Sequence, residues 1–243
     1  MRKVIIIGAT SGIGLELAKI YINKGDQVGA TGRRGHLLDE LKQQFPDSVE
    51  TECFDVTGPE NIFHFDALIQ KLGGMDILIY NSGYGEVSDM PDWKIDKQTT
   101  FTNVIGFVEI VSYAFNYFIR QGSGQIAATS SIAANLPNRH APAYSASKAF
   151  MSMYMEGLFL KTARIKKEKP NANVFITDIQ PGFVKTKAAK SKVHFWEAPV
   201  EKAAKQIFKG IEKKKRKLYI THRWVVIAYL LKYVPRFMWR RFA

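Results

Sequence analysis

The sequence has very little cysteine: Cys53 is the only one among 243 residues. A single thiol excludes an internal disulfide and fits a reducing compartment such as the cytoplasm. We expect Cys53 to be a small buried side chain that closes a strand, because unpaired cysteine packs as a hydrophobe. The five histidines show no metal-ligand spacing and have no second cysteine to join, so we expect no metal site.

Long apolar runs are also missing. No stretch reaches the roughly 18 to 20 consecutive apolar residues that a membrane-spanning helix needs. The apolar run at residues 4–7 follows Arg2 and Lys3, but it is too short for a signal peptide and leads directly into a glycine turn. We therefore interpret it as a buried first strand.

Acidic residues are scarce near the C-terminus. The formal net charge is +13, and residues 200–243 contain thirteen lysines and arginines but only two acids, Glu201 and Glu212. The rest of the chain is close to neutral. Any binding that depends on this charge is therefore expected at the C-terminal end.

Short β-rich runs alternate with longer helical patterns, which is typical of βαβ units and a parallel sheet. The patterns predict strands at residues 3–7, 27–31, 50–54, 75–80, 125–129, 174–179 and 217–220. They predict helices at residues 13–23, 37–45, 59–72, 92–121, 143–167 and 200–213. Several strands are almost continuously apolar, as expected when helices cover both faces.

The predicted fold class is therefore α/β: a single doubly wound Rossmann-type parallel sheet of about seven strands, with helices on both faces. We expect one domain at residues 1–221. A basic, aromatic-rich, amphipathic helical tail at residues 222–243 follows and is not an independent domain. In such a sheet, ligands bind at the carboxyl ends of the strands.

A glycine-rich segment follows the first predicted strand and consists of Gly8, Ala9, Thr10, Ser11, Gly12, Ile13 and Gly14. Glycines allow a tight turn and a close approach to a pyrophosphate, whose charge is favourable at a helix N-terminus. A strand-to-helix turn that binds nothing is the alternative. The strand before the segment and the helix after it are the context that a dinucleotide site requires.

The second predicted strand leads into Gly32, Arg33 and Arg34, where dinucleotide-binding folds select the ribose substituent. An acid at this point would bind a 2′-hydroxyl and repel a 2′-phosphate. The sequence instead offers two guanidinium groups, and each of them can bind phosphate in a bidentate way. A solvated surface pair is the alternative; we favour NADP(H) as the cofactor.

Tyr144 and Lys148 lie four residues apart, on one face of a predicted helix. A phenol ordinarily loses its proton near pH 10, but an ammonium about 4 Å away stabilises the phenolate by roughly 4 kcal/mol at an effective dielectric near 20. The pair alone is common on helices. Ser131, at the carboxyl end of the fifth predicted strand, adds a hydroxyl that can hydrogen-bond a carbonyl.

Together these residues resemble the short-chain dehydrogenase/reductase family, in its NADP-preferring branch, from about residue 3 to residue 220. Further matches are the Asp55-Val56 pair, the loop Asn81-Ser82-Gly83, Asn103, and the motif Pro181-Gly182-Phe183-Val184-Lys185-Thr186. The sequence departs from the family at Ile7, where threonine is usual, and at Tyr80, which replaces the first asparagine of its loop. Both positions are structural, so the departures concern local packing.

The resemblance implies an oxidoreductase that transfers a hydride between NADP(H) and a carbonyl or alcohol. Tyr144 would be the general acid/base, Lys148 would lower its pKa and bind the nicotinamide ribose, and Ser131 would orient the carbonyl. Asn103 would hold a water that relays protons from Lys148. The implied cofactor-binding residues are Gly8, Thr10, Ser11, Gly12, Ile13, Gly14, Arg33, Arg34, Asp55, Val56, Asn81, Ser82, Gly83, Tyr144, Lys148, Pro181, Gly182, Val184 and Thr186.

The segment after Pro181-Gly182 indicates the kind of substrate. It contains Phe183, His194, Phe195 and Trp196, which favour an apolar carbonyl or alcohol, although packing of a lid explains these aromatics equally well. The resemblance also implies a homo-oligomer, a dimer or tetramer formed through the helices near residues 92–120 and 143–167.

The tail has the pattern of an interfacial helix. Residues 224–231 are apolar almost all round, and Lys232, Arg236 and Arg240 share a face beside further aromatics. We expect a cytoplasmic protein with peripheral contact to the cytoplasmic face of an anionic membrane. Packing of the tail on a neighbouring subunit is the alternative.

Two other function classes compete with the enzyme. A membrane-tethered NADP(H)-binding regulator with little or no catalysis would be free to lose Tyr144 or Lys148, and the complete set of residues argues against it. A nucleic-acid binder would use the basic run at residues 213–217, but no recognisable nucleic-acid module accompanies the run, so we expect no nucleic acid.

Overall fold

The computed structural model describes residues 1–135, 137–185, 196–221 and 224. The strands are β1 (Lys3–Ile7), β2 (Gln27–Gly32), β3 (Val49–Cys53), β4 (Ile77–Tyr80), β5 (Ser123–Thr129), β6 (Asn173–Pro181) and β7 (Lys217–Ile220). They form one parallel sheet in the order β3-β2-β1-β4-β5-β6-β7. This arrangement confirms the predicted doubly wound α/β sheet.

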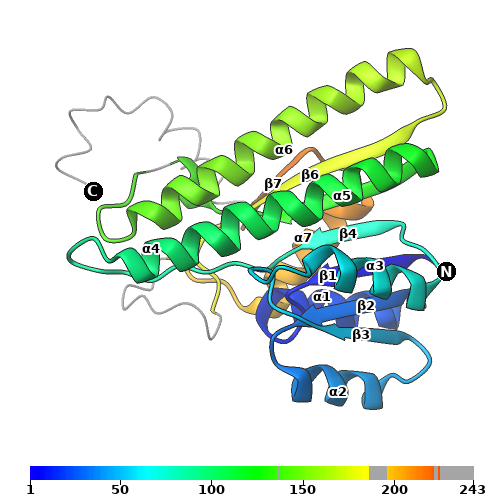
Figure 1. Ribbon diagram of the computed structural model, residues 1–243, viewed down its shortest axis with the longest axis horizontal. Coiled ribbons are helices and arrows are strands. Elements are labelled where there is room, and N and C mark those ends of the chain that lie inside the picture. The colour runs from blue at the N-terminus through cyan, green and yellow to red at the C-terminus, as the bar shows by residue number, and fades with distance from the viewer. Residues whose placement is uncertain (136, 186–195, 222–223, 225–243) are drawn as a thin grey trace.

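Helices cover both faces of the sheet (Figure 1). One core contains residues of α1 (Gly12–Asn23), α2 (Gly35–Gln44) and α7 (Val200–Glu212). The other contains residues of α3 (Asn61–Leu72), α5 (Gly106–Gln121) and α6 (Pro142–Glu168), while α4 (Trp93–Thr100) precedes α5. The long helices α5 and α6 lie on the side of the sheet opposite α2.

The interior strand β1 shows why the apolar runs form strands that are buried on both faces. Val4 and Ile6 belong to the first core, Ile5 and Ile7 to the second, and all four side chains are fully buried. Successive side chains of a strand point to opposite faces, so a strand between two helical layers needs apolar residues at every position. The parallel arrangement brings the carboxyl ends of all seven strands to one edge.

The stretch predicted as one helix at residues 92–121 is interrupted. Between α4 and α5 lies a π-helical turn, η1 (Phe101–Ile105). The hydroxyl of Tyr80, at the end of β4, donates to the carbonyl of Thr102 in this turn over 3.0 Å. A π turn is a short change of backbone hydrogen bonding within an otherwise helical stretch, so the sequence pattern predicts one continuous helix across it. A short 3₁₀ helix, η2 (Ile132–Asn135), also follows β5 and was not expected.

The expectation that Cys53 is buried is wrong. Cys53 does close β3, but its side chain is exposed. The reason is the position of β3 at the edge of the sheet, where only one neighbouring strand covers it. The prediction treated this strand like a central one.

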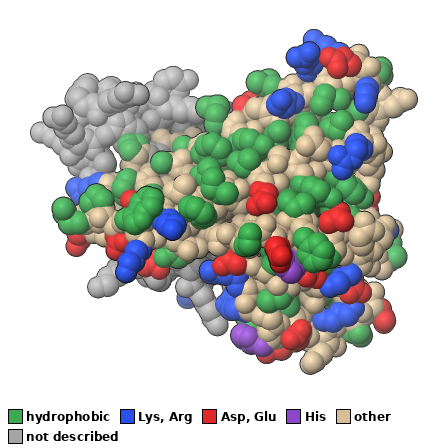
Figure 2. Space-filling model, viewed as in Figure 1, with side chains coloured by type: hydrophobic (Ala, Val, Ile, Leu, Met, Phe, Trp, Pro, Cys, Tyr) green, Lys and Arg blue, Asp and Glu red, His purple; other side chains and the backbone are tan. Residues whose placement is uncertain are grey.

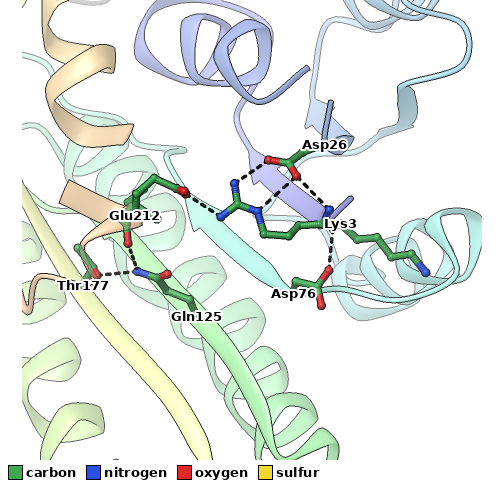
Figure 3. A network of polar contacts seen from close by, with 8 residues as sticks. Lys3, Asp26, Asp76, Gln125, Thr177 and Glu212 are labelled. Carbon is green, nitrogen blue, oxygen red and sulfur yellow. Dashed lines mark hydrogen bonds and ion pairs between the residues drawn. The ribbon is translucent and has the colours of Figure 1, made fainter. Parts of the chain in front are cut away.

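A polar network holds the amino ends of the strands together (Figure 3). Arg2 pairs with Asp26 and Glu212, each over 2.7 Å, and Lys3 N donates to Asp76 Oδ2 over 2.8 Å. These contacts lie at the end of the sheet opposite the glycine-rich turn, so they contribute to stability rather than to ligand binding.

Within the described part of the chain, no helix has both the length and the apolar character that crossing a bilayer requires. The predicted tail at residues 222–243 lies outside the described residues, apart from Trp224.

Candidate active site

The glycine-rich turn joins β1 to α1 and leaves no room for side chains at two of its glycines. Gly8 has a left-handed backbone with φ of +88°, and a Cβ there would lie 2.9 Å from the backbone nitrogen of Ser82. A Cβ on Gly14 would lie 2.1 Å from the carbonyl oxygen of Gly8. Asn81, directly after β4, donates from Nδ2 to the same carbonyl over 3.3 Å. The backbone therefore forms a bare cradle at the start of α1, as a pyrophosphate requires.

The two arginines after β2 lie beside this cradle. Arg34 Nη2 donates to Thr10 Oγ1 over 2.6 Å and to Ser11 Oγ over 2.7 Å, so its guanidinium rests on the turn. Arg33 Nη1 lies 3.4 Å from Asp55 Oδ2. Both arginine side chains are exposed. This part of the cradle therefore carries positive charge, and it fits a phosphate group additional to the pyrophosphate.

Asp55 and Val56 form the next part of the wall. The carboxylate of Asp55 accepts from the backbone nitrogen of Thr57 over 3.0 Å, which closes a tight turn after β3. Val56 is buried, and a Cβ on Gly106 would lie 2.1 Å from its carbonyl oxygen. The start of α5 therefore packs directly on the backbone of this pair.

Three side chains predicted to be catalytic meet where β5 ends and α6 begins. Pro142 occupies the first turn of α6, which places Tyr144 in the first turn and Lys148 one turn later. The hydroxyl of Tyr144 hydrogen-bonds Ser131. Lys148 Nζ donates to the carbonyl of Thr129 over 2.9 Å and lies 5.8 Å from the centre of the Tyr144 ring.

Asn103 lies in the π turn and is completely buried. Its Oδ1 accepts from the backbone nitrogen of Tyr84 over 2.8 Å, and its Nδ2 donates to the carbonyl of Tyr84 over 2.7 Å and to Ser147 Oγ over 2.9 Å. Gly83 lies between Asn103 and Lys148: a Cβ there would be 3.2 Å from Lys148 Nζ and 3.5 Å from Asn103 Oδ1. Asn103 thus fixes the loop after β4 against α6.

Burial sets the ionisation of the two titrating groups. It raises the pKa of Tyr144, and the hydrogen bond with Ser131 only partly opposes this. Burial also lowers the pKa of Lys148 to about 8, against the opposing charge of Asp178. Burial therefore outweighs any lowering of the phenol pKa in the protein alone, where Lys148 is itself desolvated and its Nζ donates to a backbone carbonyl.

The segment after β6 completes the edge of the site. Pro181 ends β6, and Val184 is buried and pairs with Ala198. A Cβ on Gly182 would lie 2.0 Å from Nε1 of the buried Trp224, so this indole packs directly on the glycine. Phe183 and Trp196 pack edge-on against the same indole, with ring centres 5.7 and 6.2 Å from it.

The structure thus brings together nearly all the predicted site residues at one edge of the sheet. Gly12 and Ile13 begin α1, and Ser82 lies between Asn81 and Gly83 in the loop after β4. Thr186, His194 and Phe195 lie outside the described residues.

Sequence reasoning missed three groups that hold the site: Ser147, the backbone of Thr129 and the buried Asp178. The carboxylate in the apolar stretch of β6 was the one available signal.

Comparisons with known proteins agree with this fold. The structure resembles a short-chain dehydrogenase from Burkholderia cenocepacia in complex with NADP, with a TM-score of 0.82 and 20% identity over 99% of this chain and 96% of that one. It also resembles a short-chain dehydrogenase/reductase from Burkholderia phymatum in complex with NAD, with a TM-score of 0.84 and 18% identity over 94% and 92%. These likenesses show the fold.

Sequence relatives cover most of the chain. An uncharacterized oxidoreductase of Mycobacterium tuberculosis is 28% identical over 254 residues, which span 100% of this chain and 97% of the relative. The 11-beta-hydroxysteroid dehydrogenase 1A of Arabidopsis thaliana is 31% identical over 259 residues, 95% of this chain and 71% of the relative. The family model described as short chain dehydrogenase matches residues 2–196. The chain therefore belongs to the short-chain dehydrogenase family of oxidoreductases.

Proposed function

We propose that the protein is an NADP(H)-dependent oxidoreductase that interconverts a hydrophobic carbonyl compound and its alcohol, with Tyr144 as general acid/base. One observation carries this proposal. Tyr144, Ser131 and Lys148 meet at the carboxyl ends of the strands, where the bare glycine cradle also lies. A proton donor and a nucleotide cradle at one edge are what hydride transfer to a carbonyl requires.

A nicotinamide cofactor held in the glycine cradle would supply the hydride that the carbonyl carbon accepts. The carbonyl oxygen gains a proton from the Tyr144 hydroxyl, and the product is an alcohol. The raised pKa of Tyr144 keeps this proton in place at neutral pH, as the acid in a reduction needs. Ser131 hydrogen-bonds the same oxygen and orients it. Lys148 supplies positive charge that favours the phenolate left behind.

The preference for NADP(H) rests on the two guanidinium groups beside Thr10, Ser11 and Asp55. Structures similar in fold bind NAD or NADP, so the fold leaves the choice to local residues. Asp55 is half-exposed and already faces Arg33. The remaining charge at this corner is positive, which favours a ribose 2′-phosphate.

An apolar substrate is supported by the aromatic residues beside Ser131. Ile132, directly after Ser131, packs with Trp224 in one apolar cluster. Phe183 and Trp196 pack on the same indole and remain partly exposed. Apolar groups at the rim of a site favour an apolar ligand because its surface leaves water on binding.

We also propose assembly into a dimer or tetramer through α4, α5 and α6. Large apolar side chains are exposed on and between these helices, and Figure 2 shows hydrophobic groups on this face. They are Trp93, Phe101, Ile105, Phe150, Met153 and Leu160. An apolar face of this kind is typical of a protein–protein interface.

Peripheral contact of the tail with an anionic cytoplasmic membrane leaflet remains part of the proposal. Each basic residue near such a surface contributes about 1 kcal/mol. Co-sedimentation with anionic vesicles tests it, comparing the full chain with one that ends at Thr221. Binding that needs the tail and weakens with salt supports the proposal, while loss of the oligomer on truncation would make the tail an assembly element.

The basic run at residues 213–217 does not favour nucleic acid. Lys214 lies 4.0 Å from the centre of the Phe175 ring, and Arg216 pairs with Glu156 over 3.0 Å. Lys217 lies 3.5 Å from Asp178. These three cations therefore have partners within the protein.

The test of the function is a screen of carbonyl compounds of increasing chain length with NADPH, followed by cofactor absorbance. Wild-type protein and Tyr144→Phe are compared on each compound. We expect turnover that rises with chain length and is abolished in the variant, while NADPH binding is retained. Turnover that persists in Tyr144→Phe would refute the assignment, and polar carbonyls that turn over best would refute the substrate class.

A further inference from the structure

The buried carboxylate of Asp178 contacts Ser130, the residue directly before Ser131. Asp178 is 4% exposed, and it lies on the face of β6 where Val174 and Ile176 join the core shared with α6. The alternation of this strand predicts an apolar side chain there. A charge buried at such a position costs free energy unless several partners compensate it.

Asp178 has four such partners among the described residues. Ser130 Oγ donates to Oδ1 over 2.5 Å, while Ser152 Oγ and Gln180 Nε2 donate to Oδ2 over 2.6 and 2.9 Å. Lys217 Nζ lies 3.5 Å from Oδ2. All four groups can donate a hydrogen bond to the carboxylate of Asp178. An ionised carboxylate matches them, because it only accepts hydrogen bonds.

The partners are the neighbours of the proposed catalytic residues. Ser130 directly precedes Ser131, and Ser152 lies one helical turn beyond Lys148 on α6. Gln180 also donates to Ser152 Oγ over 2.9 Å, and its Oε1 accepts from Asn135 of η2 over 2.9 Å. One carboxylate therefore links the end of β5, the segment after Ser131, and the helix that carries Tyr144 and Lys148.

We propose that Asp178 is a positioning residue of the active site: its carboxylate fixes the strand end that carries Ser131 against α6 and supplies the buried negative charge opposite Lys148. The catalytic meaning of this inference rests on the proposed function. The charge arrangement itself rests on the contacts of Asp178 and does not depend on any substrate.

Charged and polar groups reach this centre from several elements. Lys148 Nζ lies 5.8 Å from the centre of the Tyr144 ring on its own helix and donates to the Thr129 carbonyl of β5. The charge of Asp178 of β6 acts on it, and Gly83 lies between it and the neutral amide of Asn103 from η1. Lys217 of β7 binds Asp178 as a second cation. Burial lowers the pKa of Lys148, and the charge of Asp178 opposes that effect.

The test replaces this charge with a neutral group of nearly the same size. In Asp178→Asn, Lys148 should lose its proton at a pH lower by on the order of one unit, because the opposite charge is gone. The titration is followed by NMR of the full chain with labelled lysine, and Lys148→Met identifies the signal. This readout needs no substrate.

Asp26→Asn is the matched control. It makes the same change in a buried carboxylate at the opposite end of the sheet (Figure 3), so it should lower the melting temperature without moving the titration of Lys148. If Asp178→Asn also changes only the melting temperature, the carboxylate is a structural group and the inference is overturned.

Lys217→Met keeps the carboxylate and its three hydrogen bonds but removes the second cation. The negative charge of Asp178 then acts on Lys148 without a second cation beside it, so the titration of Lys148 should move to higher pH. This variant keeps the inference testable if Asp178→Asn does not fold, and a downward or absent shift would overturn it.

Activity provides the second readout. The alkaline limb of the pH–rate profile should move down in Asp178→Asn, stay in place in Asp26→Asn, and return towards wild type in Asp178→Glu. An alkaline limb that stays in place in Asp178→Asn would contradict the positioning role. If wild-type protein turns over no carbonyl while the Lys148 titration shifts as expected, the proposed function fails and the charge arrangement stands.

Discussion

The two arginines after β2 give the sharpest prediction about the cofactor, because they differ in their contacts. Within the described residues Arg33 reaches only Asp55, over 3.4 Å, whereas Arg34 makes short hydrogen bonds to Thr10 and Ser11 of the glycine-rich turn. Removing Arg33 takes away positive charge and leaves the turn intact. Removing Arg34 also releases two side chains of the turn.

A charge-assisted hydrogen bond to a phosphate contributes roughly 2 kcal/mol. Arg33→Ala should therefore weaken NADPH binding by about 30-fold, since each 1.4 kcal/mol is about tenfold, and leave NADH nearly unchanged. Arg34→Ala should weaken NADPH at least as much and NADH to a smaller extent, because the turn that holds the pyrophosphate loses its contacts.

Isothermal titration of each variant with NADPH and NADH, at low and high salt, measures these differences. Arg164→Ala is the control, since this exposed arginine lies near the end of α6 and pairs only with Glu168 among the described residues. The NADPH loss should shrink as salt rises, because salt screens exposed charges. Equal losses of NADPH and NADH in Arg33→Ala would refute the reasoning.

Three further predictions concern the cradle, the buried lysine and the base of the sheet. Gly14→Ala should abolish measurable NADPH binding and destabilise the fold by about 1–3 kcal/mol, since a Cβ at this position would overlap the Gly8 carbonyl. The control is Gly157→Ala on α6, where the added Cβ meets open space. This variant should change the melting temperature little and leave NADPH binding intact. The pKa of Lys148 is lowered from 10.5 to about 8, so between these pH values the unfolded chain binds a proton that the folded protein does not. In denaturant titrations, wild type should therefore gain stability relative to Lys148→Met as pH rises through this window. Parallel stability curves for the two proteins would contradict the lowered pKa. Burial raises the pKa of Asp26, but the bonds with Arg2 outweigh this effect and lower the pKa overall. Asp26→Asn should therefore be less stable than wild type at neutral pH, and the difference in stability should vanish as pH falls below 3.8. A difference in stability that persists in acid would show that the charge is not the cause.

The parts of the fold and the site predicted correctly are those with a local signature in the sequence. Apolar runs at every position marked the buried strands, and the glycine-rich segment, placed between a strand and a helix, marked the cradle. Tyr144 and Lys148 were placed together because helical spacing alone brings residues four apart to one face.

The parts that were missed depend on neighbours distant in sequence. Cys53 is exposed because β3 is an edge strand, which only the strand order reveals. The π turn around Asn103 is a short change of hydrogen bonding inside a stretch that is helical on both sides. Asp178 was overlooked since its partners Ser130, Ser152 and Lys217 come from three distant parts of the chain.

The contact between Gly182 and Trp224 has a consequence for how this protein can diverge. Any side chain at 182 would overlap the indole, so the glycine and the tryptophan limit each other's replacement. A smaller residue at 224 has to come first, or together with, any larger residue at 182. Among homologues that keep this packing, the two positions should vary as a pair, and libraries that diversify position 182 alone should yield few folded variants.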